Sequence, residues 1–435
     1  MRTLLYINLD FPPLSGPGVW RALGFVKYLP GYGWRSIVCC SDRSPTYNRR
    51  DESLLDQIPP GTEIHRITSR FESDIAEWME QTADRTTLRS VAWFLRGIHW
   101  RFLRDYPDVH SHWACKVAAR GIWLAARRKA DCLLTSGPPH IAHAAGLMIK
   151  RATGIPWVMD YRDQWTEDPW QVKQNRYQPR LFRRLEQAAN ARSDAVMAVS
   201  PVYLERLAEL YPEGSSADGA AGPRYHLIRN GHDLSNDVIE RSLIPPRNER
   251  LHIHFNGTAQ IGLPFGLILD LIVRLPPEQR PQFTFTGLPP AFRDDVAARG
   301  CQEWIVDLGP MEHGQSIEYC LTCDVLLAMA KPDQVRRGTI PGKVYEAIAL
   351  GRHLLAIVAP GSAVGPLIEE CGNGTLVDGS DVEDLHRAVV RILELHRTGY
   401  LNADQDPVRR RALAEKYSRR HQTRELVQLL ERIVV

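Results

Sequence analysis

The sequence predicts an α/β protein built from two doubly wound, Rossmann-like domains. Short apolar strands alternate with helical patterns along most of the 435 residues, which is typical of a parallel sheet wrapped by helices on both faces. A polar, proline-containing stretch at 237–249 interrupts this alternation, which then resumes. The chain is also longer than one ordinary core supports. We therefore expect two such domains, with a ligand cleft at the carboxyl ends of their strands.

The first domain is expected over residues 1–236. It opens with an apolar strand at 4–9, a loop and a helix at about 19–29. A Gly, Ser and Ala-rich stretch at 213–223 has the composition of a surface loop. The further strands are expected at 36–40, 132–135, 157–160, 195–199 and 225–228, and the further helices at 73–84, 88–105, 114–129, 140–153, 179–191 and 201–210.

The second domain is expected over residues 250–405, and residues 406–435 are expected to form C-terminal helices. The last helix carries an apolar stripe at helical spacing, so it should bury one face against another part of the protein. The stripe consists of Leu426, Leu429, Leu430 and Ile433. The strands of the second domain are expected at 253–255, 283–286, 304–307, 325–328, 354–358 and 374–377.

The composition is that of a globular protein. Hydrophobic residues make up 44% of the chain and charged residues 24%, as in an ordinary folded domain. No segment has the apolar length of a bilayer span, and residues 1–9 lead into a strand rather than a signal peptide, so we expect a cytoplasmic location. Among the eight cysteines only Cys320 and Cys323 have metal or redox spacing. Without nearby histidines we expect buried thiols and no bound metal.

Charge is unevenly distributed, although the net charge is only +3. Residues 1–210 hold 29 Lys and Arg against 22 Asp and Glu. The basic residues gather at 96–104, 120–129 and 176–184. Such groups are usually solvated helix faces. The alternative is contact with an anionic membrane or a lipid-phosphate acceptor, whereas nucleic acid is disfavoured because no recognised binding module is present.

The segment 338–352 joins a helix start, a basic side chain and a carboxylate. Pro341 suits the first turn of a helix and Gly351 its end, so one short helix is predicted. Lys343 then lies in the first turn, where free N–H groups and the helix dipole favour an anion such as a diphosphate. Glu346 lies on the same face and could accept hydrogen bonds from two ribose hydroxyls. An amphipathic core helix with a solvated Lys343–Glu346 pair explains the pattern equally well.

The loop after the first strand is rich in glycine. Gly16 and Gly18 resemble the start of a dinucleotide-binding fingerprint, and Asp42 stands in place of its ribose-binding acid. The third glycine would fall on Arg21, so NAD is disfavoured and no cofactor is predicted. The glycines still allow backbone N–H groups to approach a phosphate or a sugar, or they form a simple tight turn.

Polar residues follow two later strands of the first domain. Residues 136–140 open a helix, which places His140 at the predicted cleft, where its ring could hydrogen-bond a sugar hydroxyl or a phosphate. A structural histidine is the equal alternative. Residues 160–165 follow the next strand. Arg162 and Asp163 would line the acceptor side, unless they form a salt bridge without a chemical role.

In their order and spacing, these motifs together resemble those of the family 4 glycosyltransferases, over nearly the whole chain. The matching segments are Phe11-Pro12-Pro13 with Gly16 and Gly18, Ser136-Gly137-Pro138-Pro139-His140, Asp160-Tyr161-Arg162-Asp163-Gln164-Trp165, Ala198-Val199-Ser200, Arg229-Asn230-Gly231-His232-Asp233 and Pro341-Gly342-Lys343-Val344-Tyr345-Glu346. The resemblance implies the GT-B fold, in which the chain end crosses back to the first domain. It also implies transfer of a sugar from a nucleotide diphosphate, with retention of configuration and without a metal. The branch that builds bacterial surface polysaccharides and cell-envelope glycoconjugates is the most similar.

Two departures from the family pattern affect the donor site. The family has two glutamates eight positions apart; the second matches Glu346, but the first falls on Gly338. The usual Arg and Lys pair is missing from 256–262, so other cations, including Lys331, could supply the charge. The expected donor-binding residues are Gly16, Gly18, Gly257, Thr258, Arg336, Arg337, Thr339, Gly342, Lys343 and Glu346.

We therefore expect an enzyme whose second domain binds a nucleotide-diphosphate sugar. The first domain would bind a glycan, lipid-linked or small-molecule acceptor, at a catalytic centre with His140, Arg162 and Asp163. A nucleotide-sugar epimerase and a non-catalytic protein that binds sugar nucleotides or polysaccharides are the alternatives. Peripheral contact with the inner face of a membrane is compatible with the basic first domain. The sequence names neither the donor base and sugar nor the acceptor, the linkage or the oligomeric state.

Overall fold

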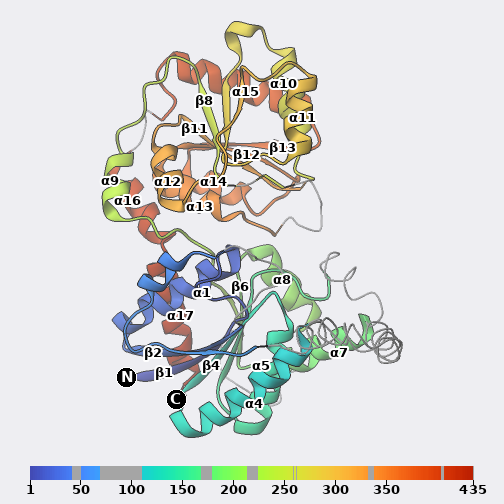
Figure 1. The fold of residues 1–435 in the computed structure, drawn as a ribbon, viewed down its shortest axis with the longest axis vertical. Helices are drawn as coiled ribbons and strands as arrows, with labels where there is room; N and C mark the ends of the chain where they lie inside the picture. Colours follow the sequence, from blue (N-terminus) through green and yellow to red (C-terminus); the bar gives the residue numbers. More distant parts are fainter. Residues whose placement is uncertain are drawn as a thin grey trace, which may run out of the picture. The chain divides into compact units, whose positions relative to one another are not determined.

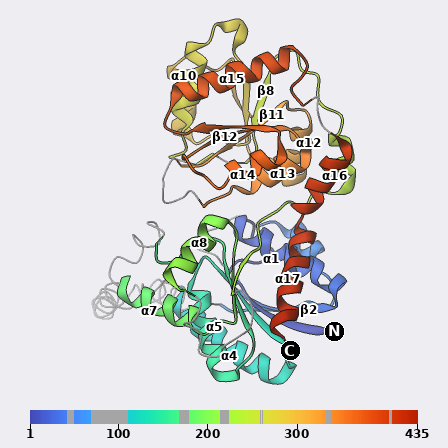
Figure 2. The ribbon, with the colours of Figure 1, turned by 180° about the vertical axis from the view of Figure 1, so that it is seen from behind.

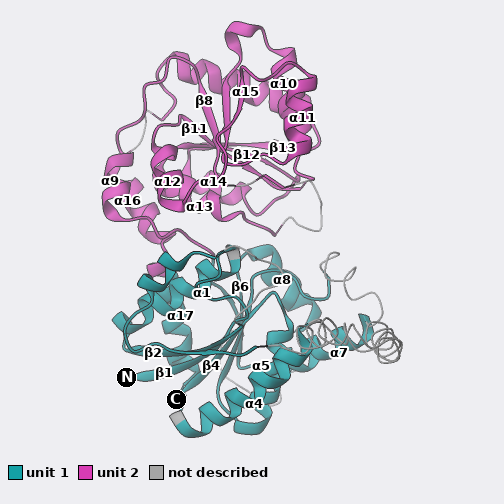
Figure 3. Cartoon of the chain, viewed as in Figure 1, with its two compact units in different colours: residues 1–229, 422–435 teal, residues 230–421 magenta. Residues whose placement is uncertain are grey.

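The protein, described by a computed structural model, divides into two compact units (Figure 3). Unit 1 comprises residues 1–229 and 422–435, and unit 2 comprises residues 230–421. The structure describes residues 1–41, 50–68, 110–167, 179–212, 224–257, 259–260, 262–331, 338–402 and 406–434. The helices expected at 73–84 and 88–105 and the loop expected at 213–223 lie outside these ranges.

The division between the units lies between Arg229 and Asn230, whereas the sequence suggested a boundary after residue 236. The first part of the stretch at 237–249 belongs to a helix, α9 (Asn236–Ser242), which lies in unit 2. Ser235 caps it by accepting a hydrogen bond from the Val238 N–H.

Unit 1 contains a seven-stranded sheet with the order β3-β2-β1-β4-β5-β6-β7. Every neighbouring pair is parallel; Tyr6, for example, lies opposite Val38 on one side and Leu134 on the other. The strands are β1 (Arg2–Ile7), β2 (Trp34–Cys40), β3 (Glu63–Arg66), β4 (Cys132–Gly137), β5 (Trp157–Tyr161), β6 (Ala195–Ala198) and β7 (Tyr225–Leu227).

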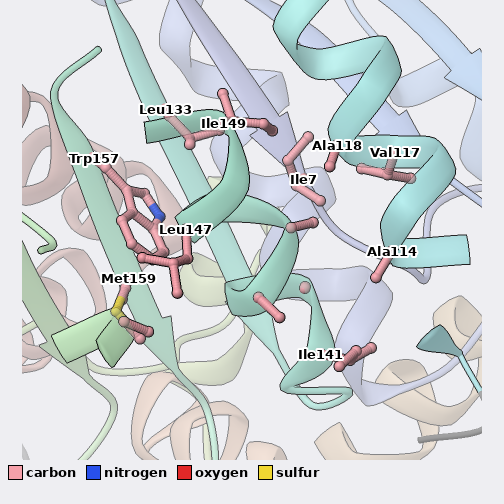
Figure 4. Packing of buried hydrophobic residues seen from close by; sticks show 14 of the residues in the cluster. Ile7, Ala114, Val117, Ala118, Leu133, Ile141, Leu147, Ile149, Trp157 and Met159 are labelled. Atoms are coloured by element: carbon pink, nitrogen blue, oxygen red, sulfur yellow. The ribbon is translucent and has the colours of Figure 1, made fainter. Parts of the chain in front are cut away.

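Alternate residues of this sheet face two separate layers of helices. Leu5 and Ile7 of β1 pack in one core and Leu4 and Tyr6 in the other, as the two-residue period of a strand requires. Figure 4 shows the first core close by. It is covered by α4 (Ser111–Arg128), α5 (Ile141–Thr153), α7 (Pro179–Asn190) and α8 (Pro201–Leu210).

The opposite face of this sheet is covered by α1 (Pro17–Tyr28) and α17 (Arg419–Ile433), which lie side by side in Figures 1 and 2. Leu426, Leu429 and Leu430 of α17 are buried in this second core, and Ile433 packs at its edge. The expected return of the C-terminal helix to the first domain is therefore confirmed. Short 3₁₀ helices at Leu29–Tyr32 and Glu52–Gln57 complete the described elements of unit 1.

Unit 2 contains a six-stranded parallel sheet with the order β10-β9-β8-β11-β12-β13. The strands are β8 (His252–Phe255), β9 (Gln282–Phe285), β10 (Ile305–Asp307), β11 (Val325–Met329), β12 (His353–Val358) and β13 (Gly374–Asp378). One core joins this sheet to α10 (Phe265–Arg274), α11 (Pro290–Ala298) and α15 (Val382–Arg397). The remaining helices are α12 (His313–Leu321), α13 (Gly342–Leu350), α14 (Gly365–Cys371) and α16 (Pro407–Lys416), with a 3₁₀ turn at Pro277–Gln279.

Both sheets confirm the predicted doubly wound α/β architecture, and both contain a point where the strand order reverses. In unit 1 this point lies between β1 and β4, and in unit 2 between β8 and β11. The loops that leave two such neighbouring strands run in opposite directions and leave a crevice at the carboxyl edge of the sheet. Ligand-binding residues are therefore expected in the loops that follow these four strands.

Candidate functional site

Helix α13 follows β11 at the reversal point of unit 2. Pro341 is its N-cap and Gly351, with φ +59°, ends it, as the sequence predicts. Lys343 and Glu346 therefore lie in its first turns. The N–H groups at such a helix start have no partner within the helix, and the helix dipole makes this end attractive to anions.

Lys343 reaches from α13 to the end of β8. Its Nζ lies 3.2 Å from the centroid of the Phe255 ring. A Cβ added to Gly257 would stand 3.6 Å from this Nζ, so the loop after β8 passes directly beside the ammonium group. Gly257 has φ +102°, which favours glycine. Burial lowers the pKa of Lys343 to about 7, although Glu346 and Cys320 act in the opposite direction.

Glu346 is held by the residue that directly follows β8. The Asn256 amide donates a hydrogen bond of 2.9 Å to Glu346 Oε2, and the Ser316 hydroxyl of α12 donates to Asn256 Oδ1. His313 Nε2 lies 3.9 Å from Glu346 Oε1. The Glu346 side chain is 19% exposed, so its carboxylate is oriented by the protein and still reachable from solvent.

A second lysine approaches the other end of the loop after β8. Lys331 follows β11, and its Nζ lies 3.2 Å from the position that a Cβ on Gly262 would take. Gly262 has φ +93°. Thr339, partly buried, lies just before α13. Lys343 and Lys331 therefore lie beside the two ends of the loop after β8. Two glycines of this loop, Gly257 and Gly262, have left-handed backbone φ angles. Thr258, Arg336 and Arg337, also expected here, lie outside the described residues.

In unit 1, Arg162 connects the loops after β1 and β4. Its Nε donates a hydrogen bond of 3.3 Å to the Gly137 carbonyl, and its Nη2 donates to the Pro138 carbonyl. A Cβ on Gly18 would stand 2.2 Å from Arg162 Nη1. The absence of a side chain at Gly18 therefore makes room for the guanidinium. Gly16 is the N-cap of the same helix, α1.

His140 is buried, with 1% of its surface exposed. Its ring stacks on Trp165 with the centroids 5.6 Å apart, and the rings of His143 and Tyr161 lie at 5.5 Å. Neither ring nitrogen makes a well-formed hydrogen bond to a described residue. Burial lowers the pKa of His140 well below its usual value, and His143 and Arg162 add to this effect. The ring is therefore neutral, and it is enclosed by its neighbours.

Asp163 follows Arg162 in the loop after β5. It lines a pocket together with Trp165, Glu186 and Tyr203. Glu186 accepts hydrogen bonds from the hydroxyls of Tyr161 and Thr166, and burial raises its pKa. The structure thus brings His140, Arg162 and Gly18 to one place, and Asp163 lines a pocket with Trp165, the ring on which His140 stacks.

One buried ion pair near this place was missed by the sequence reasoning. Arg21 donates two hydrogen bonds of 2.9 Å to Asp160, and the Ser136 hydroxyl donates to Asp160 at 2.8 Å. Arg21 also donates to the carbonyls of Ile228 and Arg229. Asp160 is fully buried. The sequence contained a signal for this ion pair. Arg21 occupies the position of the third glycine of a dinucleotide fingerprint, close to the sheet, and a cation buried there needs a carboxylate partner.

The predicted residues therefore fall into two groups. Unit 1 contains Gly16, Gly18, His140, Arg162 and Asp163. The other described ones lie in unit 2, namely Gly257, Thr339, Gly342, Lys343 and Glu346. Cys320 and Cys323 are free thiols and both are buried. Within the ranges that the structure describes, no three metal-ligating side chains form a cluster and no helix has the length and apolarity of a bilayer span.

Comparison with known proteins matches part of the chain to a sequence family. Residues 18–218 match the sequence model of the family described as "Glycosyl transferase 4-like domain". No curated protein matches the chain significantly in sequence.

Solved structures share the fold over nearly the whole chain. A glycosyltransferase from Rickettsia africae ESF-5 is 13% identical with a TM-score of 0.64, and the alignment covers 99% of this chain and 98% of that one. HepE from Anabaena, solved with UDP and glucose, is 13% identical with a TM-score of 0.60, over 99% and 100% of the two chains. A UDP-N-acetylglucosamine 2-epimerase is 15% identical with a TM-score of 0.52, over 98% and 94%.

At identities of 13–15%, the structural likeness shows the fold alone. The match to the family model adds evidence on the family of residues 18–218. The resemblance to family 4 glycosyltransferases that the motifs suggested is thereby confirmed: the chain contains a glycosyl transferase 4-like domain in unit 1 and has the GT-B fold.

Proposed function

We propose that the protein is a glycosyltransferase that moves a sugar from a nucleotide-diphosphate sugar to an acceptor. The observation that carries the proposal is the arrangement at the reversal point of unit 2. There Lys343, the start of α13, the glycine-containing loop after β8 and an oriented carboxylate, Glu346, lie together. The glycosyl transferase 4-like domain in unit 1 supports the same activity.

The diphosphate would bind between the start of α13 and the loop after β8. Lys343 and Lys331 approach this loop from two elements, and the first N–H groups of α13 add donors for phosphate oxygens. Gly257 and Gly262 lack side chains that would keep the phosphates away from the backbone. Gly342 and Thr339 stand at the helix start, and Thr258, Arg336 and Arg337 stay part of this proposed donor site.

The ribose would bind to Glu346. A carboxylate accepts hydrogen bonds from two neighbouring hydroxyls, and the Asn256 amide occupies one lone pair of Oε2 and so fixes its rotamer. The proposal assigns charge neutralisation of the donor to lysines and the helix start, and it includes no metal or other cofactor. A chelator should therefore leave the transfer rate unchanged, and a loss that Mg²⁺ or Mn²⁺ restores would contradict this part.

Unit 1 would hold the acceptor and contact the transferred sugar. Arg162 and the backbone near Gly16 and Gly18 offer positive charge and donors, Asp163 an acceptor, and the neutral ring of His140 a hydrogen bond without charge. Departure of the diphosphate is the step that such donors accelerate. We propose attack on the same face of the sugar, with retention of configuration, and transfer of the acceptor proton to the leaving phosphate.

The acceptor is proposed to be a glycan or a lipid-linked glycan of the cell envelope. This part of the proposal rests on the excess of Lys and Arg in residues 1–210, which suits an anionic lipid phosphate or membrane surface. It places the enzyme at the inner face of a membrane.

The test is a thermal-shift screen of nucleotides and nucleotide sugars, followed by product analysis with the donor that binds. Transfer to an added acceptor is the expected result. An epimerised sugar from the donor alone would instead favour the epimerase, a class in which the same fold occurs. Binding without turnover over a broad acceptor panel would favour a binding protein, and no binding of any nucleotide would contradict the donor site itself.

A further inference from the structure

The end of β8 contacts both charged residues of the candidate donor site on α13. Phe255 is the last residue of β8, and Asn256 follows it directly. The Phe255 ring lies against Lys343, whose Nζ is 3.2 Å from the ring centroid. The Asn256 amide donates a hydrogen bond of 2.9 Å to Glu346 Oε2. Two consecutive residues therefore each contact one charged side chain of α13.

Lys343 and Glu346 lie close to each other but do not form an ion pair. They are three positions apart in α13, a spacing at which opposite charges on a helix attract each other. Burial lowers the pKa of Lys343, and Glu346 is near enough to act in the opposite direction. Among the ion pairs of the described residues, however, none joins these two side chains within about 4 Å. The Glu346 carboxylate is held by Asn256 instead.

The hydrogen bonds around Asn256 have a fixed direction. An ionised carboxylate only accepts hydrogen bonds, so the amide must turn its Nδ2 to Glu346. Its Oδ1 then faces Ser316 of α12, whose hydroxyl donates to it. Ser316 is buried. A flipped amide would place two acceptor oxygens against each other, so Ser316 holds Asn256 in the orientation that Glu346 needs.

We propose that Asn256 is a positioning residue that keeps Glu346 from pairing with Lys343. The amide holds the carboxylate away from the ammonium group, and Ser316 fixes the amide. Two opposite charges less than one helical turn apart thus stay available for separate parts of one ligand. The ammonium meets the diphosphate and the carboxylate meets the ribose. This inference rests on the proposed donor site and assigns two further residues to it.

Separation of the charges matters because an ion pair would satisfy both groups before a nucleotide arrived. The nucleotide would then have to break the pair to reach either charge. The contact with Asn256 does not block the ribose in this way. It uses one lone pair of Oε2, and none of the described residues donates a hydrogen bond to Oε1, since His313 Nε2 is 3.9 Å away. Acceptor sites for two neighbouring hydroxyls therefore remain.

A packing role is the alternative for Asn256. In that role its loss would lower the stability of unit 2 and weaken all nucleotides by the same factor. In the positioning role its loss should reduce two selectivities together, the preference for ribose over deoxyribose and the preference for a diphosphate over a monophosphate. Ratios of affinities therefore separate the two roles.

Calorimetry with UDP, 2′-deoxy-UDP and UMP measures these ratios. In Asn256→Ala the preference for UDP over 2′-deoxy-UDP should fall about tenfold, because the carboxylate is no longer aimed at the ribose. The preference for UDP over UMP should fall about threefold, because the ammonium is engaged by Glu346. Ser316→Ala should lower both ratios by a smaller factor, since the amide remains.

Asn248→Ala is the matched control. The Asn248 amide also donates to a carboxylate of unit 2, Asp324, at 3.0 Å. Its removal should leave both ratios unchanged, whatever its effect on the melting temperature. In a Lys343→Met background the competing ammonium is absent, so Asn256→Ala should lower the ribose preference less than it does in the unaltered protein.

Crystal structures without a nucleotide test the same inference directly. In Asn256→Ala a carboxylate oxygen of Glu346 should lie within about 4 Å of Lys343 Nζ, whereas in Asn248→Ala it should stay on Asn256. The proposal is overturned if Glu346 stays apart from Lys343 in Asn256→Ala, or if both affinity ratios of this variant equal those of the control. Failure of the unaltered protein to bind any nucleotide would contradict the donor site instead, and the crystal structures would still decide whether Asn256 separates the two charges.

Discussion

Lys343 is the residue whose charge state decides most at the candidate donor site. Its pKa of about 7 results mainly from burial beside Phe255. Titratable groups face it from three elements: His254 from β8, Cys320 from α12 and Glu346 from α13 itself. Burial also lowers the pKa of His254, to about 3, and raises that of Cys320 well above its usual value. Neither therefore changes charge near neutral pH, which leaves Lys343 to titrate there.

The affinity for a nucleoside diphosphate should fall as the pH rises above 7. Below this pKa the ammonium is charged and ready to meet the phosphates, whereas above it the amine must first take up a proton. Each further pH unit should then weaken binding up to about tenfold. Calorimetry with UDP at pH 6.5, 7.5 and 8.5, in buffers of different ionisation enthalpy, measures both the affinity and the proton uptake.

Lys343→Met is the matched variant for this experiment. It keeps the length of the side chain and removes the charge, so it should flatten the pH dependence and weaken UDP binding more than UMP binding. Equal losses for UDP and UMP with an unchanged pH profile would show that Lys343 serves packing alone.

Glu346→Gln should weaken nucleotide binding by about 1.5–3 kcal/mol, because hydrogen bonds to a charged acceptor are replaced by weaker ones. The 2′-deoxy form of the same nucleotide tests the ribose contact. It should bind the unaltered protein more weakly than the ribonucleotide does. Glu346→Gln should bind the two forms with nearly equal affinity. Glu369→Gln, on the exposed side of α14, is the control. A ribose preference unchanged in Glu346→Gln would remove the residue from the site.

At the residue scale, the sequence predicted the positions of Lys343 and Glu346 at a helix start. It did not predict the contacts that residues distant in the sequence make with them. Lys343 and Glu346 could be found because proline and glycine mark the ends of their helix. The Asn256 amide that orients Glu346 could not, since β8 and α13 are 90 positions apart in this contact. His140 was expected at the ligand cleft, with a structural role as the equal alternative. The structure buries it against the Trp165 ring, a contact that depends on the packing of the 160–165 segment.

The C-terminal end of α13 is fixed by two arginines. Arg410 of α16 donates hydrogen bonds to the carbonyl of Leu350, the last residue of α13, and to the Ser242 hydroxyl of α9. Arg352 donates to the carbonyls of Ser242 and Leu321. Both side chains are buried. Cations at a helix C-terminus are favourable, and these two also connect α13 with its neighbouring helices.

Gly351→Ala tests how strongly α13 depends on these arginine contacts. Gly351 has φ +59°, and a Cβ there would stand 2.1 Å from Arg410 Nε. The strained backbone and the displaced guanidinium should cost about 1–3 kcal/mol of stability and weaken UDP binding. Urea unfolding and calorimetry measure the two effects.

Gly266→Ala is the matched control, because a Cβ on Gly266 in α10 meets nothing within 4 Å. It should leave stability unchanged or raise it by about 0.5–1 kcal/mol. Equal stability and equal UDP affinity in the two variants would show that the Arg410 side chain can move aside without cost and does not fix α13.

At the element scale, the sequence predicted the described strands other than β3. Their apolar residues are continuous in some, such as β12 (HLLAIV), and alternate with polar ones in others, such as β9 (QFTF). The edge strand β3 (Glu63–Arg66) was missed because its residues are mostly polar and it pairs on one side only, with β2. α9 was taken for a linker because it is short and polar; its Ser235 cap was the available signal. Helix ends marked by proline or glycine were predicted more closely than strand ends, which depend on pairing with neighbours.

The chain passes from unit 1 to unit 2 between residues 229 and 230 and returns to unit 1 between residues 421 and 422. Near these crossings His232 N–H donates to the Tyr417 carbonyl, and Arg419 N–H donates to the His232 carbonyl. The His232 ring also hydrogen-bonds the Ala414 carbonyl at 2.7 Å. The two crossing segments are therefore bridged inside unit 2, which the order of motifs along the sequence could not reveal.

Leu426→Ala should destabilise unit 1 selectively. Leu426 is fully buried in the core that α17 shares with α1, and truncation of such a residue costs about 2–5 kcal/mol. Because two units need not unfold together, hydrogen exchange followed by mass spectrometry is the measurement. Faster exchange is expected in β1 and α1, with unit 2 unchanged.

Val408→Ala is the control for this prediction, since Val408 is 71% exposed on α16 and its truncation should be nearly neutral. Accelerated exchange throughout unit 2 in Leu426→Ala would contradict the assignment of residues 422–435 to unit 1.

Because residues 422–435 belong to unit 1, a ribosome finishes unit 2 before it finishes unit 1. Domains generally begin to fold as they emerge, so during this interval the α1 side of the first sheet, including Leu4, Tyr6 and Phe25, lacks its α17 cover. A nascent chain arrested after residue 421 should thus show a protease-resistant unit 2 and a unit 1 that binds chaperones. Premature termination anywhere in unit 2 would then leave a first unit whose apolar sheet face is uncovered and prone to aggregation.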